Sequence, residues 1–127
     1  MQIESLESRT FLSAEGNTVT VPLKDSVSGN LFENFAEGTA SHLGKFTASF
    51  DATGRFVFVA ANGDELWTLP TVTRTDDPMV LHVEGTIVGG TGRFAGATGQ
   101  FSHDVFFTDT QGDFVYNAET TITLPRP

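Results

Sequence analysis

From residue 18 onward, apolar and polar residues alternate with a period of two, which is the pattern of half-buried β-strands. Residues 25–29, Asp-Ser-Val-Ser-Gly, are predicted to form a turn. No stretch carries the 3.6-residue period of a convincing helix. Short, evenly spaced strands joined by turns favour an all-β barrel or sandwich. The eight predicted strands are 18–23, 30–40, 43–50, 55–61, 65–73, 79–88, 100–108 and 113–124.

One hairpin predicts the register of two neighbouring strands. Asn62-Gly63 is a strong signal for a two-residue β-turn. Such a turn places Phe58 opposite Trp67, and Phe56 opposite Leu69. All four apolar side chains then share one face of the sheet, and such agreement normally sets strand register.

Two further turns extend this apolar face. A three-residue loop at 52–54 places Phe50 opposite Phe56. A turn at Gln111-Gly112 places Phe107 opposite Tyr116. The predicted inward face consists of Phe46, Phe50, Phe56, Phe58, Trp67, Leu69, Phe101, His103, Val105, Phe107, Phe114 and Tyr116.

An inward face of this kind predicts either a filled core or an apolar ligand pocket. Apolar pockets with a few polar groups are the usual form of small-molecule sites. His103, Tyr116 and Trp67 are the polar members of the inward face, and His42 is a further candidate. The candidate ligand-binding residues are Trp67, His103, Tyr116, Phe58 and Phe107.

Composition bounds the other functional classes. The chain has 127 residues, enough for one domain, which we assign to residues 16–127 after an N-terminal extension at 1–15. No cysteine is present, so disulfides and thiol chemistry are excluded. Twelve phenylalanines against one tyrosine and one tryptophan indicate an apolar core or cavity.

The net charge of −9 argues against nucleic acid and anionic membranes as partners, because both are themselves negative. No apolar run is long enough to span a bilayer. Residues 1–14 lack the basic start and apolar middle of a signal peptide. They resemble a Leu-Glu-x-Arg segment near the start of many exported bacterial proteins. Export and a cytoplasmic location therefore both stay open.

The glycine-dense stretch 85–100 contains a Gly-x-Gly-x-x-Ala pattern at residues 90–95. In dinucleotide-binding proteins this pattern opens a helix whose N-terminus faces a pyrophosphate. More glycines and then a β-pattern follow here, so we expect structural glycines and no bound cofactor. We expect no metal site either, because His82 and Glu84 fall on the strand face opposite to the apolar one, whereas His103 is predicted inward.

Residues 89–100, Gly-Gly-Thr-Gly-Arg-Phe-Ala-Gly-Ala-Thr-Gly-Gln, resemble the glycine signature of plant allene oxide cyclases and the corresponding segment of dirigent proteins. Residues 38–47 and 60–64 are similar to uncharacterised bacterial proteins of the same class. The resemblance implies an eight-stranded antiparallel up-and-down β-barrel of the calycin-like type. It also implies a dimer or trimer, consistent with Val57 and Val59 on the outer face of the strand that carries Phe58.

The resemblance does not carry over the known sites. Pro22 and Lys24 fall where allene oxide cyclases use Glu and Asn, and Thr98 stands where dirigent proteins usually have Arg. We expect a binding module for a small apolar ligand. An isomerase or cyclase, with His103 or Tyr116 moving a proton, and a structural domain are the alternatives. Oxidised fatty acids are the ligands that the resemblance implies.

Overall fold

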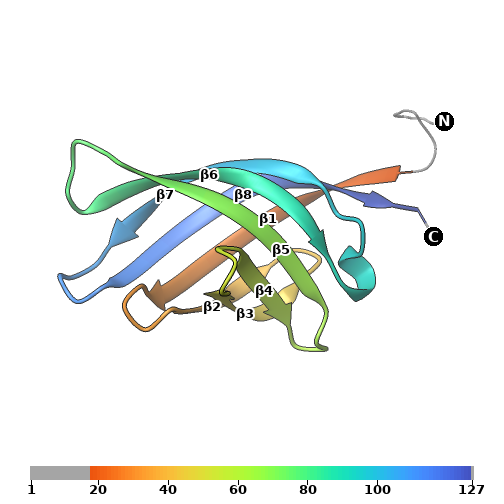
Figure 1. The fold of residues 1–127 in the computed structure, drawn as a ribbon, viewed down its shortest axis with the longest axis horizontal. Helices are drawn as coiled ribbons and strands as arrows, with labels where there is room; N and C mark the ends of the chain where they lie inside the picture. Colours follow the sequence, from red (N-terminus) through yellow and green to blue (C-terminus); the bar gives the residue numbers. More distant parts are fainter. Residues whose placement is uncertain (1–17, 127) are drawn as a thin grey trace.

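The structure is a computed structural model that describes residues 18–126. Eight antiparallel strands form one closed barrel in which each strand pairs with its neighbours in sequence and β8 pairs with β1 (Figure 1). The predicted eight-stranded barrel is therefore confirmed. The predicted extension at 1–15 lies outside the described residues. The strands are β1 (Thr18–Asn30), β2 (Phe35–Ala40), β3 (Gly44–Phe50), β4 (Phe56–Ala60), β5 (Glu65–Arg74), β6 (Val80–Gly90), β7 (Gly99–Phe107) and β8 (Asp113–Pro125).

The predicted turn at 25–29 is wrong. β1 runs through this segment, and the chain turns only at residues 31–34, where Asn34 takes a left-handed conformation with φ of 53°. Pairing explains the difference, because all thirteen residues of β1 lie opposite residues of β8. A continuous ladder satisfies the backbone of polar residues that would otherwise favour a turn.

The register predicted for β4 and β5 is wrong by one residue. The connecting loop has three residues, 61–63, and ends on Gly63 with φ of 94°. The amide of Ala60 donates to the carbonyl of Asp64 at 2.8 Å, which closes this longer loop. Phe58 consequently lies opposite Leu66 rather than Trp67. A slip of one residue moves every side chain of a strand to the other face.

The other two registers preserve the predicted faces. Phe50 lies opposite Phe56 across β3 and β4, as predicted. Between β7 and β8, Phe107 lies opposite Phe114 rather than Tyr116, so this register differs by two residues. An even shift leaves each side chain on its original face. The inward assignment of β7 and β8 is therefore confirmed even though the exact pairing differs.

The glycine-dense segment after β6 forms a compact turn at the end of the barrel where Thr18 and Arg126 also lie (Figure 1). It contains the 3₁₀-helix η2 (Gly92–Phe94), the only helical turn in residues 18–126. Phe94 is 1% exposed and packs into the core. Arg93 Nε lies 2.9 Å from Asp64 Oδ2, and Arg93 Nη1 donates to the carbonyl of His42 at 2.7 Å. The glycines are thus structural, as predicted.

The corrected register of β5 is directly testable with two leucines. Leu66 is 1% exposed in the core, whereas Leu69 is 47% exposed on the outer surface. We expect Leu66→Ala to lower the free energy of unfolding by about 2–5 kcal/mol through loss of packing. The matched Leu69→Ala should lower it by less than about 1 kcal/mol. Chemical denaturation measures both, and the reverse order of effects would restore the register predicted from sequence.

Candidate ligand-binding cavity

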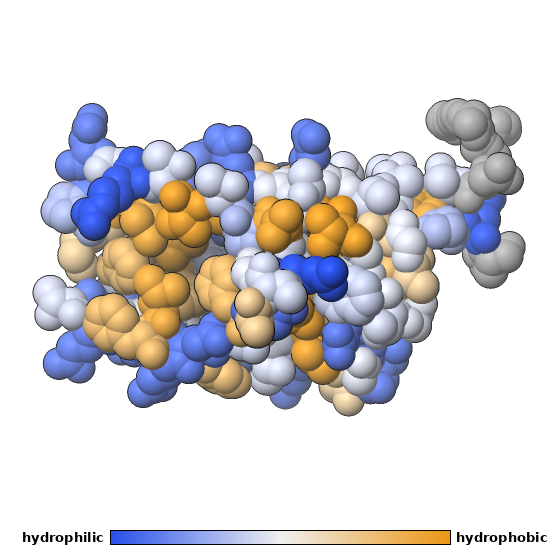
Figure 2. Space-filling view, viewed as in Figure 1, coloured by the Kyte–Doolittle hydropathy of each residue, from blue (hydrophilic) through white to orange (hydrophobic). Residues whose placement is uncertain are grey.

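A cavity of about 360 Å³ occupies the lumen of the barrel. It reaches the end formed by the β1–β2 turn, which contributes Leu31 and Asn34 to its lining. Figure 2 shows apolar side chains gathered around a hollow at this end of the molecule. The cavity is of the size that small-molecule sites occupy in proteins. The predicted alternative of a completely filled core is therefore not what the structure shows.

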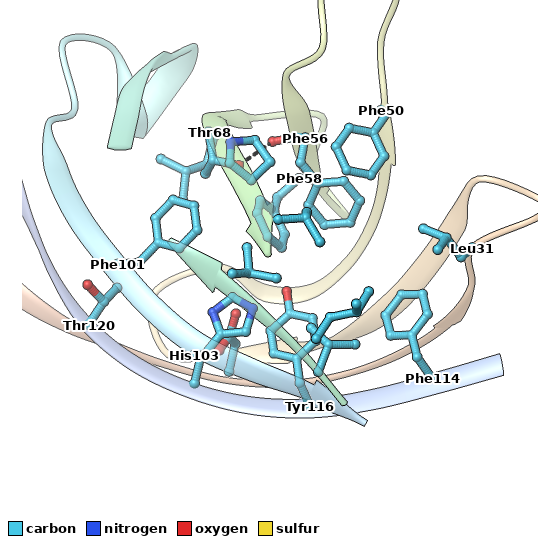
Figure 3. Close-up of a pocket in the computed structure, with 18 of the residues that line it drawn as sticks. Leu31, Phe50, Phe56, Phe58, Thr68, Phe101, His103, Phe114, Tyr116 and Thr120 are labelled. Carbon is cyan, nitrogen blue, oxygen red and sulfur yellow. Dashed lines mark hydrogen bonds between the residues drawn. The ribbon is translucent and has the colours of Figure 1, made fainter. Parts of the chain in front are cut away.

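Aromatic side chains form two opposing walls of the cavity (Figure 3). On one side the ring centroids of Phe50 and Phe56 are 4.8 Å apart, and those of Phe56 and Phe58 are 5.2 Å apart. On the other side the imidazole of His103 stacks on the phenol of Tyr116, with centroids 4.2 Å apart and an angle of 12° between the planes. These walls offer ring faces and edges to a ligand between them.

Three titratable residues line the cavity: Asp25 from β1, His103 from β7 and Tyr116 from β8. Asp25 Oδ1 and His103 Nδ1 are buried and have no hydrogen-bond partner. Thr68, by contrast, donates its hydroxyl to the carbonyl of Phe56 at 2.8 Å. Most buried polar atoms in proteins are partnered, so two residues of one lining that each carry an orphaned atom mark the cavity as a candidate site.

Burial dominates the electrostatics of these three groups. It raises the pKa of Asp25 to about 6, although the backbone amide of Ala118 partly opposes the shift. Burial lowers the pKa of His103 to about 4, and the nearby His82 lowers it further. Burial and the negative charge of Asp25 together raise the pKa of Tyr116. At neutral pH the lumen therefore holds one carboxylate, one neutral imidazole and one protonated phenol.

Four of the five predicted ligand-binding residues line the cavity: Phe58, His103, Phe107 and Tyr116. Trp67 does not, because the corrected register turns it to the outer surface. Its indole Nε1 donates to Glu65 Oε1 at 2.7 Å, and the guanidinium of Arg55 lies 5.1 Å from its ring centroid. The predicted inward placement of Trp67 and Leu69 is therefore wrong.

His42 is also not part of the cavity. It is exposed in the turn between β2 and β3, where its backbone φ is 66°. Asp25 is the titratable lining residue that sequence reasoning missed, because it fell in the predicted turn. The available signal was alternation, since Leu23, Asp25 and Val27 occupy every second position and therefore one face of a strand.

His82 lies on the outer face of β6, as predicted. Its Nδ1 is 2.8 Å from Asp104 Oδ1, and its Nε2 is 2.9 Å from Glu84 Oε2 and 3.2 Å from Ser102 Oγ. The hydrogen bond to Asp104 is the main cause of a raised pKa for His82. Within residues 18–126, no three His, Asp or Glu side chains are arranged to hold a metal ion.

Comparison with known proteins gives one informative match. No family model matches the chain, and no curated protein matches its sequence. The barrel is similar to the solved structure of the pterocarpan synthase dirigent protein GePTS1, with a TM-score of 0.55 and 15% sequence identity. The match covers 87% of this chain and 88% of the other. It establishes a dirigent-like barrel fold. No helix among the described residues is long and apolar enough to cross a membrane.

The buried position of Tyr116 makes a prediction at alkaline pH. Tyr116 is the only tyrosine, so phenolate absorbance reports on this residue alone. We expect it to stay protonated in the folded protein well above the ordinary pKa of about 10, because its pKa is raised. As pH passes about 10, the unfolded chain releases a proton that the folded chain retains, so stability falls. An ultraviolet titration that detects phenolate in the folded protein near the ordinary pKa would refute this.

Proposed function

We propose that this protein binds a small, largely apolar molecule in the lumen of its barrel. The carrying observation is a cavity of about 360 Å³ whose lining is mainly apolar and rich in aromatic rings, and whose lining residues Asp25 and His103 each carry an unpartnered polar atom. An apolar ligand would gain from leaving water for these walls. A polar group on the same ligand would find a hydrogen-bond partner in Asp25 or His103. A purely structural domain has no comparable need for either feature.

The similar dirigent protein is a pterocarpan synthase, so that protein uses a barrel of this fold for small-molecule chemistry. The likeness supports a small-molecule role for this chain. It does not identify the ligand, because one fold hosts many functions and the site residues decide among them.

A second candidate is catalysis of the isomerase or cyclase type. It is favoured by Asp25, whose raised pKa of about 6 lies near the range suited to proton transfer at neutral pH. Catalysis would require turnover of an oxidised fatty acid, the ligand class that the resemblance implies. Asp25→Asn would then reduce the rate by about 100-fold or more while binding persists. Absence of turnover leaves the binding function.

We also propose that the barrel self-associates as a dimer or trimer through the outer face of β4, β5 and β6. The register of β5 adds Trp67 and Leu69 to this face, beside Val57 and Val88. Leu69 and Val88 are 47% and 42% exposed in the single chain. Figure 2 shows apolar side chains on the outer surface between polar neighbours. Contiguous apolar surface of this kind commonly marks an interface.

Sedimentation velocity tests the self-association. We expect an oligomer at micromolar concentration, and we expect Leu69→Lys to shift it toward monomer because a charge would be buried at the interface. Thr121→Lys is the control, because Thr121 is exposed on the outer face of β8, away from β4, β5 and β6. A monomeric wild-type protein would end this part of the proposal.

Ligand binding is tested with a neutral probe, phenylbutanol, by titration calorimetry. We expect saturable binding that Ala118→Phe abolishes, because Ala118 lines the cavity and the larger side chain would occupy it. Thr121→Phe places the same group on the exposed face of the same strand and should leave binding intact. Circular dichroism checks that both variants fold. Binding that survives Ala118→Phe in a folded protein, or no binding at all, would overturn the lumen site.

A further inference from the structure

We propose that the lumen selects apolar ligands that carry an organic ammonium group, which binds against Asp25. This inference rests on the proposed function, because it names the ligand class of the same cavity. Its basis is the composition of the cavity lining. Among the described residues, Asp25 is the only acidic residue of the lining, and the lining contains no Lys or Arg. The carboxylate thus lies in an apolar cavity without a cationic partner.

A buried carboxylate without a cation is an unfavourable arrangement, since charged groups that leave water are normally paired. The other titratable groups of the lining, His103 and Tyr116, do not supply a positive charge. Burial among aromatic rings keeps the imidazole neutral, and a phenol carries no positive charge in any state. On the outer face of the sheet, His82 lowers the pKa of His103 and Asp104 raises it. A cationic ligand would supply the missing charge.

The walls of the cavity also suit an ammonium group. The face of an aromatic ring is the negative part of its quadrupole, and organic cations bind to such faces. Tyr116, Phe58 and Phe114 line the same cavity as Asp25. The two unpartnered atoms, Asp25 Oδ1 and His103 Nδ1, can both accept hydrogen bonds, the second when the proton of the neutral ring is on Nε2. An ammonium group is a donor only, and so complements them.

The same arrangement disfavours carboxylate ligands. A fatty acid that entered the lumen would place a second negative charge near Asp25, with no Lys or Arg in the lining to compensate. The fatty acids implied by the sequence resemblance therefore fit this cavity less well than amines. A neutral alcohol is intermediate, because it donates one hydrogen bond without charge.

Three probes of one shape separate these classes: phenylbutylamine, phenylbutanol and phenylbutanoate, titrated by calorimetry at about pH 7.5. We expect the amine to bind at least about tenfold more tightly than the alcohol, and the carboxylate to bind weakest. Asp25→Asn should remove the advantage of the amine, so that amine and alcohol then bind with similar affinity. Glu37→Gln makes the same change in net charge at an exposed position of β2 and should preserve the advantage.

A pH series on the unmodified protein gives an independent readout that needs no variant. Below about pH 6 Asp25 takes up a proton, so the ratio of amine to alcohol affinity should fall between about pH 7.5 and about pH 5. High ionic strength removes nonspecific attraction of the amine to the acidic surface and should leave the ratio at neutral pH nearly unchanged.

The outcomes distinguish the two levels of the proposal. Equal affinities for amine and alcohol, with a pH-independent ratio, would overturn the ammonium inference and leave the binding function intact. Tighter binding of the carboxylate would do the same. Failure of all three probes to bind would instead overturn the lumen site itself.

Discussion

The ladder between β1 and β8 is the constraint on which the rest of the molecule depends. It extends from Thr18 opposite Pro125 to Asn30 opposite Asp113, along the full length of both strands. By closing the sheet it removes exposed strand edges and makes one face of every strand point into a common interior. The ladder also keeps residues 25–29 extended, and this is why a carboxylate in the middle of β1 lies in the lumen.

The two ends of the barrel differ, because one is closed by packed side chains and the other contains the hollow. At one end Phe94 is buried and Arg93 joins the glycine-dense turn to Asp64 and to the β2–β3 turn. At the other end the amide of Leu31 donates to the carbonyl of Gly112, and Asn30 Nδ2 donates to the carbonyl of Gln111. These bonds fix the turns around the hollow without filling it, so the cavity reaches this end of the barrel.

The fold of this protein and the character of its lumen depend on different residues. The barrel superposes on a dirigent protein over most of both chains, yet only 15% of residues are identical. Barrel closure depends on alternation and on glycines at turns, which many sequences can supply. The character of the lumen depends on a few inward positions, and here those positions bring Asp25, His103 and Tyr116 among phenylalanines. Any ligand chemistry of the lumen therefore depends on these side chains.

Alternation of apolar residues was enough to predict eight strands, and it placed His103, Phe107 and Tyr116 inward because an even error in register preserves the face of a strand. Alternation did not predict the register between β4 and β5, where one additional loop residue determines which side chains face inward. Whether the loop after β4 has two or three residues depends on the backbone conformation of Gly63, and the third residue moved Trp67 outward and Leu66 inward. The position of Asp25 was not predicted for another reason, because its polar neighbours in sequence favour a turn. Only pairing with β8, far along the chain, makes that segment a strand and gives the lumen its charge.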